Sequence, residues 1–345
     1  MKSKMDKSNM HKVIMDFPKQ FRIGLTVAQN VKVDGDFNQL IFCGMGGSAL
    51  PAEILKMLRN FYEWPVAIKI HKSYGLPARV SSRALIFTIS YSGNTEETIS
   101  SYEEAKKRNL TIIGIANGGK LIELCQKDKT PFVKLSPLKI QPRSAIGYQF
   151  GAIIKILSNS NIIKDLDNDI LAMEKTLKSK TLENQGKKIA QKIKGRIPII
   201  YASDKFKALA QIWKINFNEN SKSPAFWNYF PELNHNEMEG FQEIQSPKPC
   251  LPAGRSKVKS NFHIIILRDK KLDHQRILKR MAVTGKLLKE KGLDVSSVDI
   301  QSQNLVTKIF STILISLWAS YYLALEYETD PTPVKTVEEF KKKLR

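Results

Sequence analysis

The sequence predicts an α/β protein built on parallel sheets, and three observations support this prediction. Short apolar runs alternate with longer helical patterns through the first half of the 345-residue chain. A glycine-rich turn, Cys43-Gly44-Met45-Gly46-Gly47-Ser48-Ala49-Leu50, joins the first of these runs to a helical pattern. A similar strand-turn-helix unit opens the second half. This alternation is typical of parallel sheets with helices on both faces.

In the first half, the expected strands are residues 40–43, 66–70, 84–89, 111–115 and 132–135. The expected helices are residues 52–59, 96–107 and 121–126, with a further helix starting near Gly147. Residues 1–33 are expected to form a helical lead-in that is interrupted at Asp16, Pro18 and Gln20. Ligands of such sheets bind beyond the carboxyl ends of the strands.

The second half follows a polar, helical connector at residues 159–194 and lacks a glycine turn. Its expected strands are residues 199–202, 262–267 and 295–298, and its expected helices are 206–218, 272–291 and 309–325. The length corresponds to about two domains. We place these domains at residues 1–157 and 158–345.

The apolar segment 309–325 raises the question of a membrane span. It contains Ser311, Thr312, Ser316 and Ser320, and it falls short of the roughly 20 apolar residues that a spanning helix needs. We therefore expect a buried helix and no membrane partner.

The chain carries a net charge of +22, with 55 basic and 33 acidic residues. The lysines are scattered, and many stand beside acids, as in Glu103-Glu104-Ala105-Lys106-Lys107-Arg108. No nucleic-acid-binding motif accompanies them, so a lysine-rich surface that attracts anionic substrates is preferred over a nucleic-acid partner.

The three cysteines are Cys43, Cys125 and Cys250. Their odd number and wide spacing argue against a disulfide framework or a zinc site and suit a reducing cytoplasm. The N-terminus lacks the apolar core of a secretory signal.

The glycine-rich turn has the form of an anion site, because backbone amides at a helix N-terminus attract negative charge. It is no Walker A loop, since no Gly-Lys-Ser/Thr follows. Gly44, Gly46 and Ala49 fit a relaxed dinucleotide fingerprint, but the next expected strand ends at His71 and Lys72 without the acid that holds a ribose. A tight turn without a ligand remains the alternative.

A second phosphate-type turn follows the strand at 84–89. Ser90, Ser92 and Thr95 place hydroxyl groups at one strand end, and Asn94 or Thr95 is a natural helix N-cap. A polar turn with a cap would explain Asn94 and Thr95 but not both serines. Two such turns on one sheet indicate a phosphate site.

Three further residues are candidates for chemistry. Arg143, beside Pro142, could meet oxyanion charge in bidentate fashion or be a surface arginine. Glu219, at the end of an apolar helix, is expected to be partly buried, as an acid–base group requires. His235 lies in a polar loop and is either catalytic or a packed, hydrogen-bonded residue.

Together these residues resemble the bifunctional phosphoglucose/phosphomannose isomerases, an archaeal-type branch of the sugar isomerase (SIS) fold. The resemblance runs from about residue 38 to the C-terminus. The motifs that carry it are Gly44-Met45-Gly46-Gly47-Ser48, Ser90-Tyr91-Ser92-Gly93-Asn94-Thr95-Glu96-Glu97-Thr98, Pro142-Arg143, Phe217-Asn218-Glu219-Asn220, Glu232-Leu233-Asn234-His235-Asn236 and Asp330-Pro331-Thr332-Pro333-Val334.

The resemblance implies two SIS domains, each a doubly wound, flavodoxin-like parallel sheet, in a homodimer with a shared active site. It implies reversible isomerisation of glucose 6-phosphate or mannose 6-phosphate with fructose 6-phosphate, without a metal or cofactor. The residues that match the family's phosphate contacts are Gly47, Ser48, Ser90, Ser92 and Thr95.

The resemblance also assigns the chemical roles. Glu219 matches the base that moves a proton between C1 and C2, and Arg143 matches the arginine near the reacting carbons. His235 matches the residue that assists ring opening from the other subunit. Lys341, the first of three consecutive lysines, matches a C-terminal active-site lysine, and Thr332 matches the threonine that makes room for either C2 epimer.

Two other functions compete with this one. A phosphosugar-sensing SIS protein without catalysis would be expected to carry an attached DNA-binding domain, and the N-terminal lead-in shows none. An amino-sugar phosphate isomerase would be expected to carry a glutaminase half with an N-terminal cysteine, which this sequence lacks.

Overall fold

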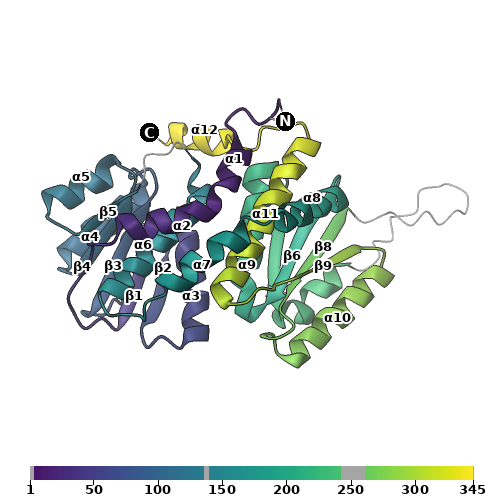
Figure 1. The fold of residues 1–345 in the computed structure, drawn as a ribbon, viewed down its shortest axis with the longest axis horizontal. Helices are drawn as coiled ribbons and strands as arrows, with labels where there is room; N and C mark the ends of the chain where they lie inside the picture. The colour runs from purple at the N-terminus through teal and green to yellow at the C-terminus, as the bar shows by residue number, and fades with distance from the viewer. Residues whose placement is uncertain (1–3, 136–139, 242–260, 345) are drawn as a thin grey trace, which may run out of the picture. The chain divides into compact units, whose positions relative to one another are not determined.

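The structure is a computed structural model that describes residues 4–135, 140–241 and 261–344 (Figure 1). Its contacts divide the chain into two compact units. One unit is Lys12–Lys178, and the other combines Met1–His11 with Ser179–Arg345. The units differ from the expected domains in two stretches: residues 158–178 belong with the first unit, and the first eleven residues belong with the second.

The first unit is built on a five-stranded sheet in the order β2-β1-β3-β4-β5, with every neighbouring pair parallel. The strands are β1 (Gln39–Cys43), β2 (Ala67–His71), β3 (Ala84–Ser90), β4 (Thr111–Ala116) and β5 (Phe132–Lys134). All five expected strands of this half are confirmed to within one residue at each end. Because β1 lies between β2 and β3, the strand order reverses beside it, which is where doubly wound sheets bind ligands.

Helices cover both faces of this sheet, as expected. They are α3 (Leu50–Tyr62), α4 (Glu96–Lys107), α5 (Gly119–Lys127) and α6 (Ile146–Asn159). On one face, Ile41 and Ile86 of the strands pack with Tyr102 of α4 and Leu121 of α5. All residues of β3 are buried, which a strand shows only when both of its faces are covered.

The N-terminal lead-in differs from its prediction. It forms α1 (Met10–Met15) and α2 (Phe17–Val27), so the break expected at Asp16 is confirmed. The breaks expected at Pro18 and Gln20 were wrong. Pro18 occupies the start of α2, where its missing amide hydrogen costs nothing, and Gln20 is a buried helical residue whose amide donates to the Ser144 carbonyl at 2.7 Å.

The second unit has a four-stranded parallel sheet in the order β7-β6-β8-β9. Its strands are β6 (Ile197–Ser203), β7 (Phe226–Phe230), β8 (Phe262–Arg268) and β9 (Asp294–Asp299). The sequence does not predict strand β7, because its aromatic run, Phe-Trp-Asn-Tyr-Phe, has no apolar–polar alternation. The polar stretch 159–194 forms α7 (Asp167–Leu177), which belongs to the first unit, and α8 (Lys180–Ile193), which belongs to the second.

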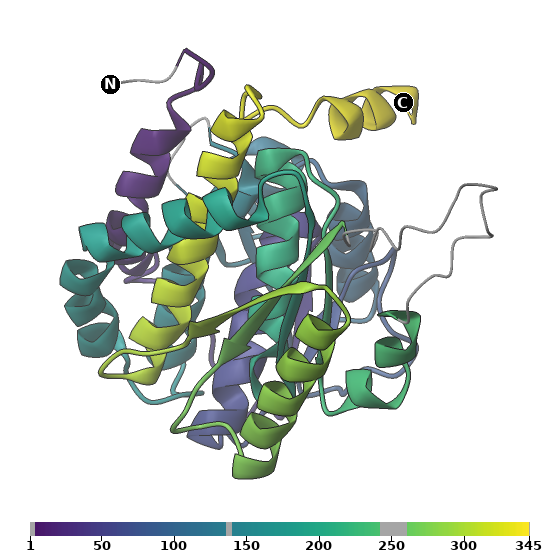
Figure 2. The same cartoon turned by 90° about the vertical axis from the view of Figure 1, so that its right-hand side faces the viewer.

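The remaining helices of this unit are α9 (Lys207–Asn216), α10 (Gln275–Glu290), α11 (Leu305–Glu326) and α12 (Lys335–Lys343). Figures 1 and 2 show α10 and α11 on opposite sides of the sheet. By length and composition, helix α11 could cross a membrane, but 83% of its 18-residue apolar window is buried. The expected buried helix is therefore confirmed as a core element against which α8 and α9 pack.

Candidate active site

The turns after β1 and β3 meet at the reversal of strand order. The glycine-rich segment forms a 3-10 turn, η1 (Gly46–Ala49), that leads into α3. The Ser48 hydroxyl oxygen accepts a hydrogen bond of 3.1 Å from the Tyr91 backbone amide, and it lies 3.4 Å from the Gln149 amide nitrogen. Ser48 thus joins the two phosphate-type turns to each other and to α6.

Gly47 allows a third segment to approach these turns. A Cβ atom at this position would lie 2.4 Å from the backbone nitrogen of Arg143, which belongs to the short helix η2 (Pro142–Ser144). The structure therefore places Arg143 directly beside the turn after β1. Its side chain is 1% exposed, which excludes the alternative of a surface arginine.

Ser90 organises the turn after β3. Its hydroxyl oxygen accepts from the Gly93 amide at 3.0 Å and from the Thr95 amide at 3.4 Å, and it lies 2.8 Å from the Thr95 hydroxyl. Of the two expected N-cap residues, Asn94 and Thr95, the structure has Thr95 at the N-cap of α4. Its side chain makes no capping hydrogen bond. Ser92 is exposed and accepts from the Asn94 amide at 3.3 Å.

The structure adds a turn that the sequence analysis missed. Residues 117–119 follow β4, and the Gly118 carbonyl lies so close to Gly93 that a Cβ there would be 1.7 Å away. The Asn94 side chain accepts from the Lys120 amide at 3.0 Å, so its role is to hold this turn. The available signal is an Asn-Gly-Gly sequence that begins two residues after the expected strand 111–115.

Two weak acids beside these turns, Tyr91 and Cys43, are buried. Burial raises the pKa of Tyr91 to about 12 and that of the Cys43 thiol to about 12. The turns after β1 and β3, which we call the cradle, therefore present hydroxyl and amide groups together with the buried Arg143. This donor set suits a phosphate dianion. Cys43 and Cys125 are buried free thiols, and Cys250 lies outside the described residues.

Glu219 lies in the second unit, on a one-turn π-helix, η4 (Phe217–Ser221), that continues α9. Its side chain is half-buried, as expected. Two buried asparagines hold this turn, one directly before it and one within it. The Asn216 amide donates to the Ser316 hydroxyl at 2.7 Å, and the Asn220 amide donates to the Ser320 hydroxyl at 2.9 Å. π-Turns inside helices are frequent at functional sites.

Lys222 links the Glu219 turn to the C-terminal segment. It has a left-handed backbone (φ 56°), and its ammonium group donates to the Glu219 carbonyl and, at 3.3 Å, to the Pro331 carbonyl. Thr332 is the next residue, and its amide donates to the Asp330 carboxylate at 3.0 Å. The structure thus brings the backbone beside Thr332 to the Glu219 turn.

The two remaining candidates of the second unit are on its surface. His235 ends the short helix η5 (Glu232–His235), and Lys341 lies on α12; both are exposed. Among the residues that the structure describes, no group of three or more histidine, cysteine or acidic side chains could hold a metal ion.

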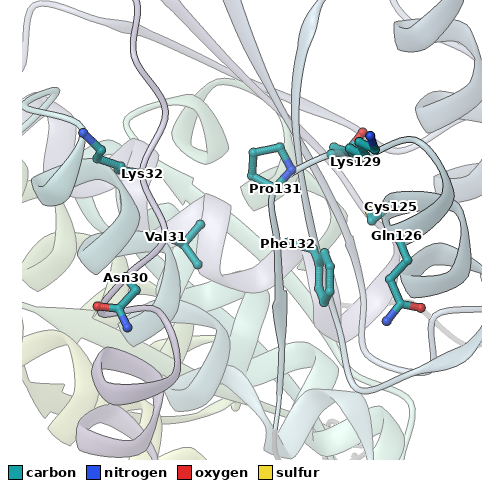
Figure 3. Close-up of a pocket in the computed structure, with 9 residues that line it drawn as sticks. Asn30, Val31, Lys32, Cys125, Gln126, Lys129, Pro131 and Phe132 are labelled. Atoms are coloured by element: carbon teal, nitrogen blue, oxygen red, sulfur yellow. The ribbon is translucent and has the colours of Figure 1, made fainter.

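A cavity of about 580 Å³ in the first unit is unrelated to these residues. It lies at the start of β5, where Pro131 and Phe132 face the segment 30–32 (Figure 3). This is the amino end of the strand, opposite to the end that carries Ser48 and Ser90. None of the candidate residues lines it.

Both sheets repeat the same order, in which the first strand of each unit lies between its second and third. Together with the hydroxyl-rich cradle at the first reversal of strand order, this doubled architecture defines a protein of the sugar isomerase class with two SIS domains. The SIS domain model matches residues 36–140, and the model of the bacterial phospho-glucose isomerase C-terminal SIS domain matches residues 182–344.

The chain is 35% identical over 336 residues to a bifunctional phosphoglucose/phosphomannose isomerase of Caldicellulosiruptor bescii, a match that covers 94% of this chain and 95% of that protein. The chain belongs to the family of bifunctional phosphoglucose/phosphomannose isomerases, and it is an isomerase.

Two further relatives show the breadth of the fold. A D-glucosamine-6-phosphate 4-epimerase of Sulfolobus acidocaldarius is 35% identical over 212 residues, covering 60% of this chain and 65% of that protein. The crystal structure of a glucosamine-6-phosphate deaminase from Thermotoga maritima superposes with a TM-score of 0.67 at 16% identity, covering 93% of this chain and 96% of that one. The latter similarity concerns the fold alone.

Proposed function

We propose that this isomerase interconverts glucose 6-phosphate and mannose 6-phosphate with fructose 6-phosphate through a cis-enediol(ate). The observation that carries the proposal is the cradle formed by the turns after β1 and β3, in a chain of this family. Its contacts to the 6-phosphate come from Gly47, Ser48, Ser90, Ser92 and Thr95. The phosphate does not react, so its binding energy serves to orient the sugar.

The chemical step needs a base at carbon and positive charge at oxygen. The proton on C2 of an aldose is weakly acidic, and its removal leaves an enediolate whose negative charge must be stabilised. Glu219 moves the proton between C1 and C2. Arg143 stabilises the enediolate, and its burial favours this role because a charge acts more strongly in a site that excludes water.

Ring opening precedes proton transfer and requires a proton to move from O1 to the ring oxygen. His235 performs this step with Lys341, and the active site is shared between the subunits of a homodimer. The exposure of His235 within its own subunit supports a role toward a partner. Thr332 provides space for either epimer at C2, and the link from Lys222 supports its location near Glu219.

The reaction as proposed uses no cofactor and no metal, and the protein works in the cytoplasm. Neither nucleic acid nor a membrane is a partner. The high positive charge then serves to attract phosphorylated sugars.

A second candidate is isomerisation of an amino-sugar phosphate. The 35% identity to a D-glucosamine-6-phosphate 4-epimerase favours it, although that match covers only 60% of the chain. A non-catalytic phosphosugar-binding protein is the third candidate. The first candidate predicts turnover of glucose 6-phosphate and mannose 6-phosphate, the second predicts turnover of an amino-sugar phosphate, and the third predicts no turnover.

A coupled assay of Glu219→Gln tests the function. We expect the wild-type protein to convert both 6-phosphates to fructose 6-phosphate. Loss of the general base lowers kcat by about 10²–10⁴-fold, while affinity for fructose 6-phosphate stays near the wild-type value. Glu290→Gln, on the exposed end of α10, is the control and retains full activity. Near-wild-type turnover by Glu219→Gln would refute the assignment, and turnover of glucosamine 6-phosphate alone would favour the second candidate.

A further inference from the structure

A buried ladder of hydrogen bonds joins the Glu219 turn to α11. Its two rungs are the contacts from the Asn216 amide to Ser316 and from the Asn220 amide to Ser320. All four of these side chains are 0% exposed. Each rung connects residues 100 positions apart in the chain.

Each serine also fixes the direction of its rung. The Ser316 hydroxyl donates to the Ile313 carbonyl at 2.6 Å, and the Ser320 hydroxyl donates to the Ser316 carbonyl at 2.8 Å. Because each hydroxyl hydrogen is used within α11, the oxygen is left to accept from the asparagine. The two asparagine amides are therefore held in one orientation.

The spacing of the rungs matches the change of helix type. Ser316 and Ser320 are one α-helical turn apart on α11. Asn216 is the last residue of α9, whereas Asn220 lies within the π-turn, so the rungs hold the chain on either side of the point where the helix widens. Glu219 stands between them and is adjacent to Asn220.

We propose that Ser320 and Ser316 are positioning residues for Glu219: by holding Asn220 and Asn216, they fix the π-turn and so aim the carboxylate. The inference rests on the proposed role of Glu219 as the base. Buried polar pairs are most sensitive when one partner is removed, because the other loses its hydrogen bond in a medium without water. Displacing a reacting group by about 1 Å can lower a rate by about 10²-fold.

A matched control is available on the same helix. Ser311 is also buried in α11, at 4% exposure, and its hydroxyl makes no hydrogen bond within the part of the chain that the structure describes. Ser311→Ala therefore removes a buried hydroxyl without changing the ladder. A difference in kcat between Ser311→Ala and Ser320→Ala therefore reports the effect of the ladder.

The experiment compares Ser320→Ala, Ser316→Ala and Ser311→Ala by steady-state kinetics with fructose 6-phosphate, with a melting temperature for each. We expect kcat to fall about 10–100-fold in Ser320→Ala and less in Ser316→Ala, whose rung is farther from Glu219. KM should stay near the wild-type value, because the phosphate cradle is on other elements. Ser311→Ala should keep the wild-type kcat.

Two additional variants separate positioning from folding. In the Glu219→Gln background, Ser320→Ala should cause no further loss, since the group that it positions is already absent. Ser320→Cys keeps the approximate size of the side chain but offers a weaker hydrogen-bond acceptor. It should therefore fold even if Ser320→Ala does not, and its kcat should lie between those of the wild type and Ser320→Ala. A Ser320→Ala or Ser320→Cys variant with lowered stability but wild-type kcat would overturn the inference. Turnover by Glu219→Gln would refute the proposed function, whereas wild-type kcat in the Ser320 variants would refute only the positioning role. The two failures are therefore distinguishable.

Discussion

The hydroxyl groups of Ser90 and Thr95 lie 2.8 Å apart at the carboxyl end of β3. Thr95 occupies the N-cap position of α4, but its side chain bonds to Ser90 and does not cap the helix. The helix N-terminus therefore relies on something other than its N-cap side chain. An anion suits this position, because the first-turn amides and the helix dipole both attract negative charge.

Replacing Ser90 with alanine tests this arrangement. The change removes an acceptor for two backbone amides and the partner of the Thr95 hydroxyl, so the turn loses its shape. We expect KM for fructose 6-phosphate to rise at least about 10-fold, corresponding to about 1.4 kcal/mol. Ser101→Ala is the control, since Ser101 is another buried serine of this unit and its hydroxyl donates to the Glu97 carbonyl of its own helix at 2.9 Å. An unchanged KM in Ser90→Ala would contradict the phosphate assignment.

Replacing Gly47 with alanine should disturb both the cradle and the position of Arg143. The added Cβ would lie 2.4 Å from the Arg143 backbone nitrogen, and backbone cannot yield as a flexible side chain does. We expect a stability loss of about 1–3 kcal/mol together with a raised KM, measured by urea unfolding and steady-state kinetics. Gly118→Ala, which has open space and an extended φ of 175°, should change neither quantity. A Gly47→Ala variant with wild-type behaviour would show that the close approach is not required.

Breaking the buried ion pair between Lys308 and Asp269 should destabilise the second unit. The paired atoms are 2.5 Å apart, with exposures of 7% for Lys308 and 1% for Asp269. Lys308→Met leaves a buried carboxylate without its cation and should cost about 3–5 kcal/mol in urea unfolding. The double variant with Asp269→Asn should recover part of that loss. The exposed pair of Lys343 and Glu339 is the control, and Lys343→Met should have no measurable effect.

His263 should make the protein acid-sensitive. Burial lowers its pKa from 6.5 to about 4, because the charged ring is poorly solvated inside β8. The unfolded chain therefore binds a proton that the folded chain does not, and stability should be full above pH 6.5 and decline as the pH falls toward 4. Melting temperatures across this range should drop less steeply in His263→Gln, which cannot titrate. Equal slopes for the two proteins would contradict this role.

Much of the fold follows from local sequence. The strands of the first sheet and α11 were predicted from apolar runs and helical periodicity, because each of these elements buries its own repeating pattern. The cradle turns were also evident, since glycines and hydroxyl residues directly follow strand patterns. Strand β7 was missed because it is defined by its parallel pairing with β6, and its aromatic run has no period of its own.

Long-range contacts determined the rest of the site. The sequence indicated Arg143 but left its burial open, and only the approach of η2 to Gly47 placed it beside the cradle. In the sequence, Ser316 and Ser320 indicate only that the apolar segment 309–325 is not a membrane span. Their contacts to Asn216 and Asn220 connect residues 100 positions apart.

By itself, the sequence determined the α/β class, the phosphate-type turns and the identity of the candidate base. Only the tertiary structure decided which turns share hydrogen bonds, that Arg143 is buried and that Glu219 lies on a π-turn held by α11. The physical reason is that periodicity and turn chemistry act among neighbours in the chain, whereas burial and the pairing of buried polar groups depend on which distant segments pack together.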